Sequence, residues 1–270
     1  MTATSMPGAR DRTDDPPIPI RKIGTADLKA SLSEGYADFM SKRGDLIFVG
    51  LIYPIVGMLA SAGSAGYFLY MLFPIAAGIS LLGPLVATGF YELARRREAG
   101  LDARWRHFAD VFRSPSRGEI ASVGALLIGI FFLWLAAAGI IHTIFFGDAR
   151  HDTFGPFLRD LFTTPQGWGL IIVGNLVGLC FAVVVLAISV VSLPMLVDRR
   201  VDAGTAVRTS LAAFRENRGV LLRWGLIIAA LLVIGAIPLF VGLAVVLPIL
   251  GYSSWHLYTR LIDRSALPPV

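Results

Sequence analysis

Long apolar stretches alternate with basic, polar segments along most of the chain. A helix needs about 20 mostly apolar residues to cross the roughly 30 Å of hydrocarbon in a bilayer, and several windows meet that requirement. We predict six membrane spans: Leu46–Ser61, Tyr67–Phe90, Ile120–Phe146, Trp168–Val197, Leu221–Ile237 and Leu239–Tyr258. The expected fold class is therefore all-α, a polytopic transmembrane helical bundle.

The last two predicted spans follow one another at Ala236-Ile237-Pro238 without a polar turn. The alternative is one long buried element from Leu221 to Leu250. That run is too long for one straight crossing and contains a proline, which interrupts a helix. A tight hairpin of two spans is therefore favoured, and the single element stays open as the alternative.

Basic residues fall into four segments: the N-terminal one, the connections between spans two and three and between spans four and five, and the C-terminal tail. Of the 24 Lys and Arg residues, all but Arg150 and Arg159 lie there. Basic loops stay cytoplasmic, so both termini are expected inside. The Pro- and Asp-rich residues 1–22 lack the apolar core of a signal peptide and predict a disordered tail. The membrane domain is expected over 23–264, with a short tail at 265–270.

Each cytoplasmic segment also carries a short amphipathic pattern before the next span, with apolar residues three and four apart. The three stripes are Leu28, Leu32 and Phe39; Leu101, Trp105, Phe108 and Phe112; and Val207, Leu211 and Phe214. Thr25 and Thr205 are predicted as N-caps of the first and third helices. These helices either lie in the headgroup plane or pack on the ends of the spans.

Two further patterns complete the expected architecture. Phe154 to Phe162 has helical spacing and predicts a short helix at the outer face, with Trp168 as an aromatic anchor. Pro84, Pro194 and Pro248 each lie near the cytoplasmic third of an even-numbered span, followed by polar residues. The sequence therefore predicts three helix-hairpin repeats, each with a cytoplasmic amphipathic helix.

Composition supports the membrane interpretation and excludes several chemistries. The chain is 55% hydrophobic and 16% charged, with a mean hydropathy of +0.69. The single cysteine, Cys180, excludes an intramolecular disulfide and a cysteine-based metal cage. The net charge of +5 is explained by cytoplasmic loops, so nucleic acid is not expected as a partner. No zinc-protease motif or nucleophile elbow occurs, and we expect no enzyme activity, cofactor or metal site.

Three polar residues, Glu92, Asp198 and His256, lie near the cytoplasmic ends of the even-numbered spans. Three-fold pseudo-symmetry would bring them together, and two carboxylates with an imidazole can hold a divalent cation or relay a proton. The alternative is that each pairs with nearby arginines, as Glu92 can with Arg95 or Arg96.

Small residues predict a helix-packing seam on the fourth span, at Gly174, Asn175 and Gly178. Such spacing lets two helices approach closely while the amide bridges them. Ala121, Ala125 and Gly129 form a similar seam on the third span, so these helices are expected to pack together or to form a dimer face. No ionised side chain lies at mid-depth, which disfavours an ion-coupled transporter.

Several strings resemble one known family of bacterial integral membrane proteins. They are Ala26–Leu28, Gly35–Phe39, Gly89–Leu93 with Arg95-Arg96, Thr164–Trp168, Val191–Leu196 with Asp198-Arg199, Val246–Gly251 and Trp255–Tyr258. This pattern resembles the family called domain of unknown function 2189. The resemblance implies a bacterial inner-membrane protein with about six spans, and it implies no activity. Family members often have a histidine at the position of Tyr252.

Two functions remain open on these grounds. In the first, the protein is a non-enzymatic membrane component that organises a partner complex or the lipid environment. In the second, it is a permease for a small neutral or amphipathic solute, with the three prolines as bend points around a cavity. The first is favoured because no polar pathway is evident. The expected partners are the lipid bilayer, including anionic headgroups, and a second copy or another membrane protein.

Overall fold

The computed structural model describes residues 18–50, 81–147, 154–237 and 242–267. Throughout these residues the regular structure is helical, as predicted. The elements in chain order are α1 (Thr25–Gly50), α4 (Gly83–Glu98), the 3-10 helix η2 (Trp105–Arg113), α5 (Arg117–Phe146), α6 (Phe154–Thr163), α7 (Pro165–Asp198), α8 (Ala203–Glu216), α9 (Arg218–Ala236), α10 (Leu243–Leu261) and the short 3-10 helix η3 (Arg264–Ala266).

Three of the described helices, α5, α7 and α9, are long and apolar enough to cross a membrane. Each begins three residues before the predicted span and ends within one residue of it. The helix α10 covers most of the sixth predicted span, Leu239–Tyr258. Leu46–Ser61 lies partly, and Tyr67–Phe90 mostly, outside the described residues, so the count of six spans and the three hairpin repeats stay predictions.

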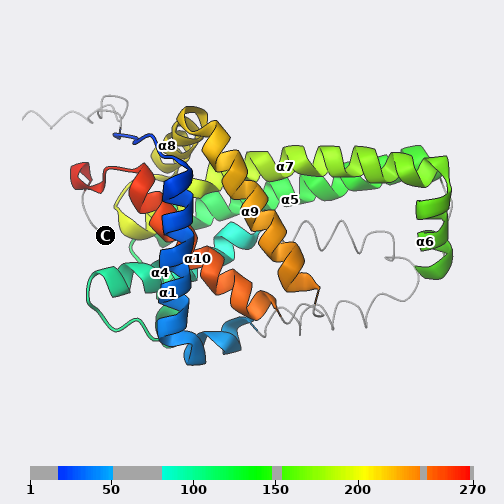
Figure 1. Ribbon diagram of the computed structural model, residues 1–270. Helices are drawn as coiled ribbons and strands as arrows, with labels where there is room; N and C mark the ends of the chain where they lie inside the picture. The colour runs from blue at the N-terminus through cyan, green and yellow to red at the C-terminus, as the bar shows by residue number, and fades with distance from the viewer. Residues whose placement is uncertain (1–17, 51–80, 148–153, 238–241, 268–270) are drawn as a thin grey trace, which may run out of the picture.

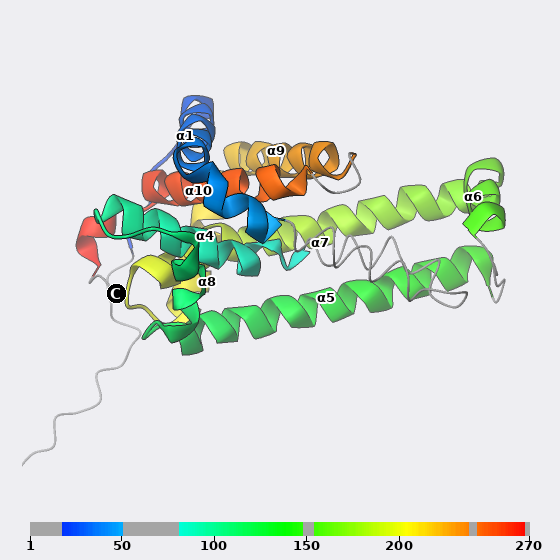
Figure 2. The same cartoon turned by 90° about the horizontal axis from the view of Figure 1, so that it is seen from below.

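The long helices α5 and α7 lie side by side and extend away from the other helices (Figure 1). The short helix α6, predicted at the outer face, closes their far end. The elements α1, α4, η2, α8 and η3 gather at the opposite end (Figures 1 and 2). These elements carry most of the described basic residues, whereas Arg159 is in α6. The basic segments are therefore sorted to one end of the molecule, as their sequence pattern predicts.

The helix α1 lies across α10, and this is the most extensive helix contact in the described structure. Leu28 and Phe39 of its predicted apolar stripe are buried against α10 and its neighbours. Gly35 allows the close approach, because a Cβ atom there would lie 2.8 Å from the Cα atom of Ser253. The first amphipathic helix thus packs on a neighbouring helix, and its apolar stripe does not face lipid.

Two predicted N-caps differ in the structure. The helix α1 begins at Thr25, so the cap position falls on Gly24, whose amide donates to Asp27 Oδ2 at 2.8 Å. The helix α8 begins two residues before Thr205, and its N-cap is Asp202, whose carboxylate accepts from the Thr205 amide. Thr205 as N-cap was wrong because Asp202 is an equally good cap earlier in the chain.

The second amphipathic segment forms a 3-10 helix and divides its apolar stripe between two environments. Phe108 packs edge-on against Phe90 of α4, with ring centroids 5.0 Å apart, and Val111 is 2% exposed. Leu101, Trp105 and Phe112 remain exposed. Because positions three apart share a face in a 3-10 helix, Val111 is buried beside Phe108, whereas Phe112, four residues after Phe108, lies on another side.

The three prolines also play different parts. Pro84 lies in the first turn of α4, where a missing amide costs little; the residues before Leu81 lie outside the described part of the chain, so its role as a bend point stays a prediction. Pro194 and Pro248 lie inside α7 and α10. One turn before Pro194, the hydroxyl of Ser210 from α8 enters the hydrogen-bond ladder of α7.

The Ser210 hydroxyl bridges two backbone groups of α7. It accepts from the Val191 amide at 3.1 Å and donates to the Ala187 carbonyl at 2.7 Å. These two groups would be direct partners in an unbroken helix. Ser210 is fully buried, and Ala206 and Ala213 on the same helix are small enough for α8 to approach this closely. The insertion therefore fixes α8 to α7 through a polar contact inside the core.

The first and last described segments are joined to one another. Ile20 and Ile262 form an isolated antiparallel bridge. The Arg21 amide donates to the Leu261 carbonyl at 2.8 Å, and the Asp263 amide donates to the Pro19 carbonyl at 3.1 Å. Both ends of the described chain therefore lie at the basic end of the molecule.

Candidate functional site

Glu92 lies near the end of α4 and is only 5% exposed. Arg95, one turn later, donates to both of its carboxylate oxygens at 2.8 and 2.9 Å. Arg96 lies 3.7 Å from the same carboxylate. A bidentate guanidinium contact is the strongest ordinary way to neutralise a buried carboxylate. The structure thus gives Glu92 the arginine partners that its spacing predicts.

Asp198 ends α7 and is 6% exposed. Its Oδ2 atom accepts from the Tyr258 hydroxyl at 2.9 Å and from Arg199 Nε at 3.0 Å. Arg264 of η3 lies 3.6 Å away. These contacts hold the end of α7 against α10 and η3.

His256 of α10 faces α1. Its Nε2 atom lies 2.9 Å from Asp38 Oδ2, and its Nδ1 atom lies 3.2 Å from Glu34 Oε2. Arg260, one turn along α10, binds Glu34 through two hydrogen bonds at 2.6 and 2.9 Å. The Arg260 hydrogen bond is the main reason that the pKa of Glu34 lies below its usual value. His256 therefore serves the contact between α1 and α10.

The three predicted polar residues thus lie at one end of the bundle, but each has its own partners. Arg264 connects two of the groups, because it binds Glu98 of α4 at 2.5 and 3.1 Å and also lies beside Asp198. Trp255 of α10 donates to the same Glu98 carboxylate at 3.2 Å. We call this set the charged layer: Glu34, Asp38, Glu92, Arg95, Glu98, Asp198, Arg199, His256, Arg260 and Arg264.

The contacts of the charged layer hold neighbouring helices together. Every carboxylate in it has an arginine or histidine partner, and the contacts tie α1, α4, α7 and α10 together. Among the described residues, no three His, Cys, Asp or Glu side chains are grouped as a metal site would need. Burial alone would raise the pKa of Glu98, but hydrogen bonds from Arg264 and Trp255 and the Arg264 charge lower it overall.

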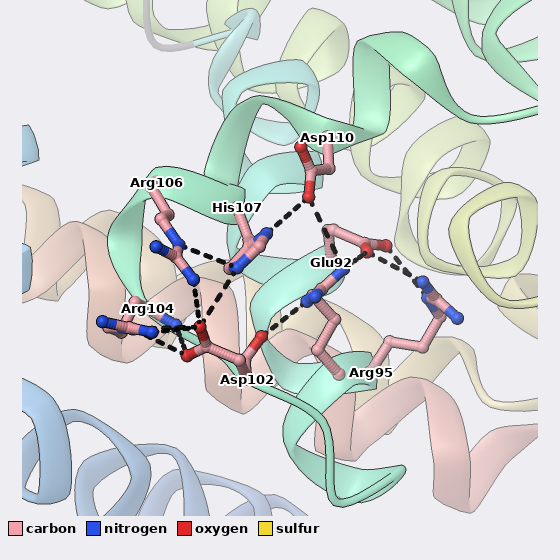
Figure 3. A network of polar contacts seen from close by, with 8 residues as sticks. Glu92, Arg95, Asp102, Arg104, Arg106, His107 and Asp110 are labelled. Carbon is pink, nitrogen blue, oxygen red and sulfur yellow. Dashed lines mark hydrogen bonds and ion pairs between the residues drawn. The ribbon is translucent and has the colours of Figure 1, made fainter.

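A second polar network lies on η2 and was missed from the sequence. The two ring nitrogens of His107 face Asp110, at 2.6 Å, and Asp102, at 3.3 Å (Figure 3). Arg104 and Arg106 also bind Asp102, at 2.8 and 2.7 Å. The hydrogen bond from Arg104 is the first cause that lowers the pKa of Asp102, and the bond from His107 does the same for Asp110.

This network also connects η2 to α4. Arg96 of α4 donates to the Asp102 carbonyl at 2.6 Å and lies 3.5 Å from Asp110 Oδ2. The sequence contained a signal for it, because Asp102, Arg106 and Asp110 are spaced four apart. These contacts hold η2 against α4 and leave its apolar side chains Trp105 and Phe112 exposed.

The predicted packing seam is realised only in part. A Cβ atom at Gly178 would lie 3.2 Å from the Trp134 ring of α5, so this glycine does lie at a tight contact between α5 and α7. Gly174 has no such neighbour. Asn175 is exposed, and its amide donates to the Ile171 carbonyl of its own helix at 2.7 Å. The stripe of Ala121, Ala125 and Gly129 is exposed on α5.

Helical architecture, three apolar helices of membrane-spanning length and basic segments sorted to one end define an integral membrane protein. The model of the family described as "Predicted integral membrane protein (DUF2189)" matches residues 72–198. The family resemblance predicted from the sequence is therefore confirmed over that part of the chain. No curated protein and no solved structure gives a significant match.

Proposed function

We propose that this protein is a non-enzymatic membrane component that organises lipids or a partner complex at its basic end. Membrane insertion follows from the apolar helices and the family match. The organising role is supported by two features of the described residues. One is the charged layer, whose contacts hold four helices together, and the other is the exposed apolar side chains of η2.

The charged layer supports a structural role because its groups are already neutralised. A catalytic carboxylate or imidazole needs a free position for substrate, whereas Glu92, Asp198 and His256 each contact two or more protein groups. Cross-helix ion pairs such as Arg260 with Glu34 and Arg264 with Glu98 favour one rigid arrangement of α1, α4 and α10. A rigid end is a suitable platform for a partner or for lipid.

The exposed side of η2 is the observation that carries the proposal. Trp105 of η2 and Leu101, which precedes η2, are 53% exposed, and Phe112 is 68% exposed. Arg104, Arg106 and Arg113 lie on the same short segment. Apolar side chains interleaved with arginines are typical of elements that enter the headgroup region of an anionic bilayer. We infer that η2 contacts the cytoplasmic leaflet.

The permease alternative has less support. Its polar lining would have to include Thr88, Ser189 and Asn175, and each of these donates to a carbonyl of its own helix. A pocket of about 560 Å³ opens along α5 at Ala136 to Ile144, away from all three. A polar route through the described residues is therefore not part of the proposal.

Depth-dependent fluorescence quenching tests the contact of η2 with lipid. In a Cys180→Ala background, Phe112→Cys is labelled with an environment-sensitive fluorophore and the protein is placed in nanodiscs of anionic phospholipid. Quenchers attached to the upper part of the acyl chains are expected to quench strongly. Arg113→Cys, the adjacent exposed residue, is the matched control and is expected to be quenched less. Equal, weak quenching at both positions would contradict the proposal.

A second experiment tests whether the protein binds lipid or a partner protein. Purification in mild detergent followed by native mass spectrometry is expected to retain phospholipid, a second copy or another membrane protein. The Trp105→Ser/Phe112→Ser variant is expected to lose that species, because the exposed apolar contact is removed. Retention of the same species by the variant would show that η2 does not hold it.

A further inference from the structure

A pocket of about 280 Å³ opens beside the first turn of α9. One wall is the N-terminal segment, with Lys22 and Ile23. The other wall is the corner between α8 and α9, residues 216–220, together with Arg223. The pocket is separate from the charged layer and from η2, and neither the family description nor the proposed function assigns it a role.

Positive charge dominates this pocket. Lys22, Arg218 and Arg223 line it, against the single carboxylate of Glu216. Within the described residues, none of the three cations forms an ion pair. Arg223 donates to the Thr25 hydroxyl at 3.1 Å, which orients its guanidinium without neutralising it. This contrasts with the charged layer, where arginines have carboxylate partners, and it leaves a net positive site for an anion.

The walls are held in place by Asn217, which is 5% exposed. Its Oδ1 atom accepts from the Ile23 amide at 2.9 Å, and its Nδ2 atom donates to the Arg21 carbonyl at 3.2 Å. The segment that carries Lys22 is therefore fixed to the α8–α9 corner. Since the site is formed before any ligand arrives, an anion would bind with little cost of ordering the walls.

An apolar surface continues from the pocket along α9. Leu222 is 44% exposed and Leu226 is 71% exposed. Positions 219, 222, 223 and 226 share one side of a helix, so the pocket and these leucines follow one another along the same face. Because α9 is one of the helices able to cross the membrane, this face is suited to acyl chains. An anion-binding site above an apolar stripe matches the shape of a phospholipid.

We propose that this pocket binds the phosphate of an anionic phospholipid headgroup, with the acyl chains along Leu222 and Leu226. This rests on the proposed function in one respect, that the basic end lies at the bilayer surface. Lys22, Arg218 and Arg223 supply the charge, and the amides of Arg218 and Gly219 at the electropositive start of α9 add to it.

The test uses the full chain purified in an uncharged detergent and titrated with short-chain phosphatidic acid, short-chain phosphatidylcholine and inorganic phosphate. Saturable binding of phosphatidic acid is expected. The Lys22→Gln/Arg218→Gln/Arg223→Gln variant is expected to bind at least about tenfold more weakly, because it removes the three positive charges that line the pocket. The control Lys29→Gln/Arg200→Gln/Arg215→Gln, with the same charge change at exposed positions outside the pocket, is expected to bind like the wild type.

Each other outcome overturns part or all of the proposal. Binding of inorganic phosphate as tight as that of phosphatidic acid would keep the phosphate site and refute the lipid. Equal losses in the two triple variants, or no saturable binding, would refute the site. Arg218→Glu, at an exposed position of the pocket lining, is the second variant if the triple one loses helix content, and it is expected to bind phosphatidic acid more weakly than the wild type. The η2 probe is expected to be quenched normally in the pocket variants, so failure of one proposal is distinguishable from failure of the other.

Discussion

The hydroxyl of Ser210 gives the sharpest stability prediction. Ser210→Ala removes the only side-chain atom between the Val191 amide and the Ala187 carbonyl, both buried. A buried polar group left without a partner costs about 1–3 kcal/mol, so two such groups give a loss of about 2–6 kcal/mol if α7 keeps its shape.

Ser192→Ala is the matched control. Ser192 is equally buried, but its hydroxyl donates to the Ile188 carbonyl one turn back in its own helix. That carbonyl also has the regular helical amide available, so the expected loss is only about 0.5–1.5 kcal/mol. The two variants therefore differ in what they leave unpaired and hardly at all in the size of the cavity.

Circular dichroism during titration with a denaturing detergent measures both losses in the same background. The loss for Ser210→Ala is expected to exceed that for Ser192→Ala by at least about 1 kcal/mol. Equal losses would refute the reasoning, because they would mean that α7 closes its own ladder when the hydroxyl is gone.

Three further predictions follow from the described contacts. Gly35→Val overpacks the contact between α1 and α10 and is expected to cost about 1–3 kcal/mol in the same titration. Thr164→Ala removes the N-cap bond of α7 and is expected to cost about 0.5–2 kcal/mol, which a lower melting temperature would report. The pKa of Glu34 is lowered in the folded protein, so its pair with Arg260 stabilises above the ordinary carboxyl pKa and is lost as the pH falls below it. Between pH 7 and pH 4, the melting temperature of Glu34→Gln is expected to fall less than that of the wild type. An equal fall in both proteins would contradict this role.

Local sequence patterns predicted what depends on local geometry. The spans at α5, α7 and α9 followed from apolar length alone, because a bilayer imposes a minimum on it. The pair of Glu92 and Arg95 followed from their spacing on one helix face. The helix α6 at the far end of α5 and α7 followed from its aromatic periodicity.

Contacts between distant segments were beyond sequence reasoning. Asp38 and His256 are 218 residues apart, and Asn217 binds a segment 194 residues earlier. No periodicity connects such positions. The convergence of Glu92, Asp198 and His256 was expected from pseudo-symmetry, but the structure pairs each with groups that symmetry does not relate. Asn217 and Ser210 had no signal at all, since a lone buried Asn or Ser looks the same as a solvated one.

The joined ends of the described chain constrain how often the polypeptide crosses the bilayer. The backbone bonds between residues 19–21 and 261–263 keep both segments at the same end of the molecule, which we expect to lie at one membrane surface. A path that starts and finishes on the same surface crosses an even number of times. We therefore predict that, with α5, α7 and α9 as three candidate spans, an odd number of further crossings lies between these segments. Protease sites inserted just before Ile18 and just after Leu267 should therefore be cut from the same side.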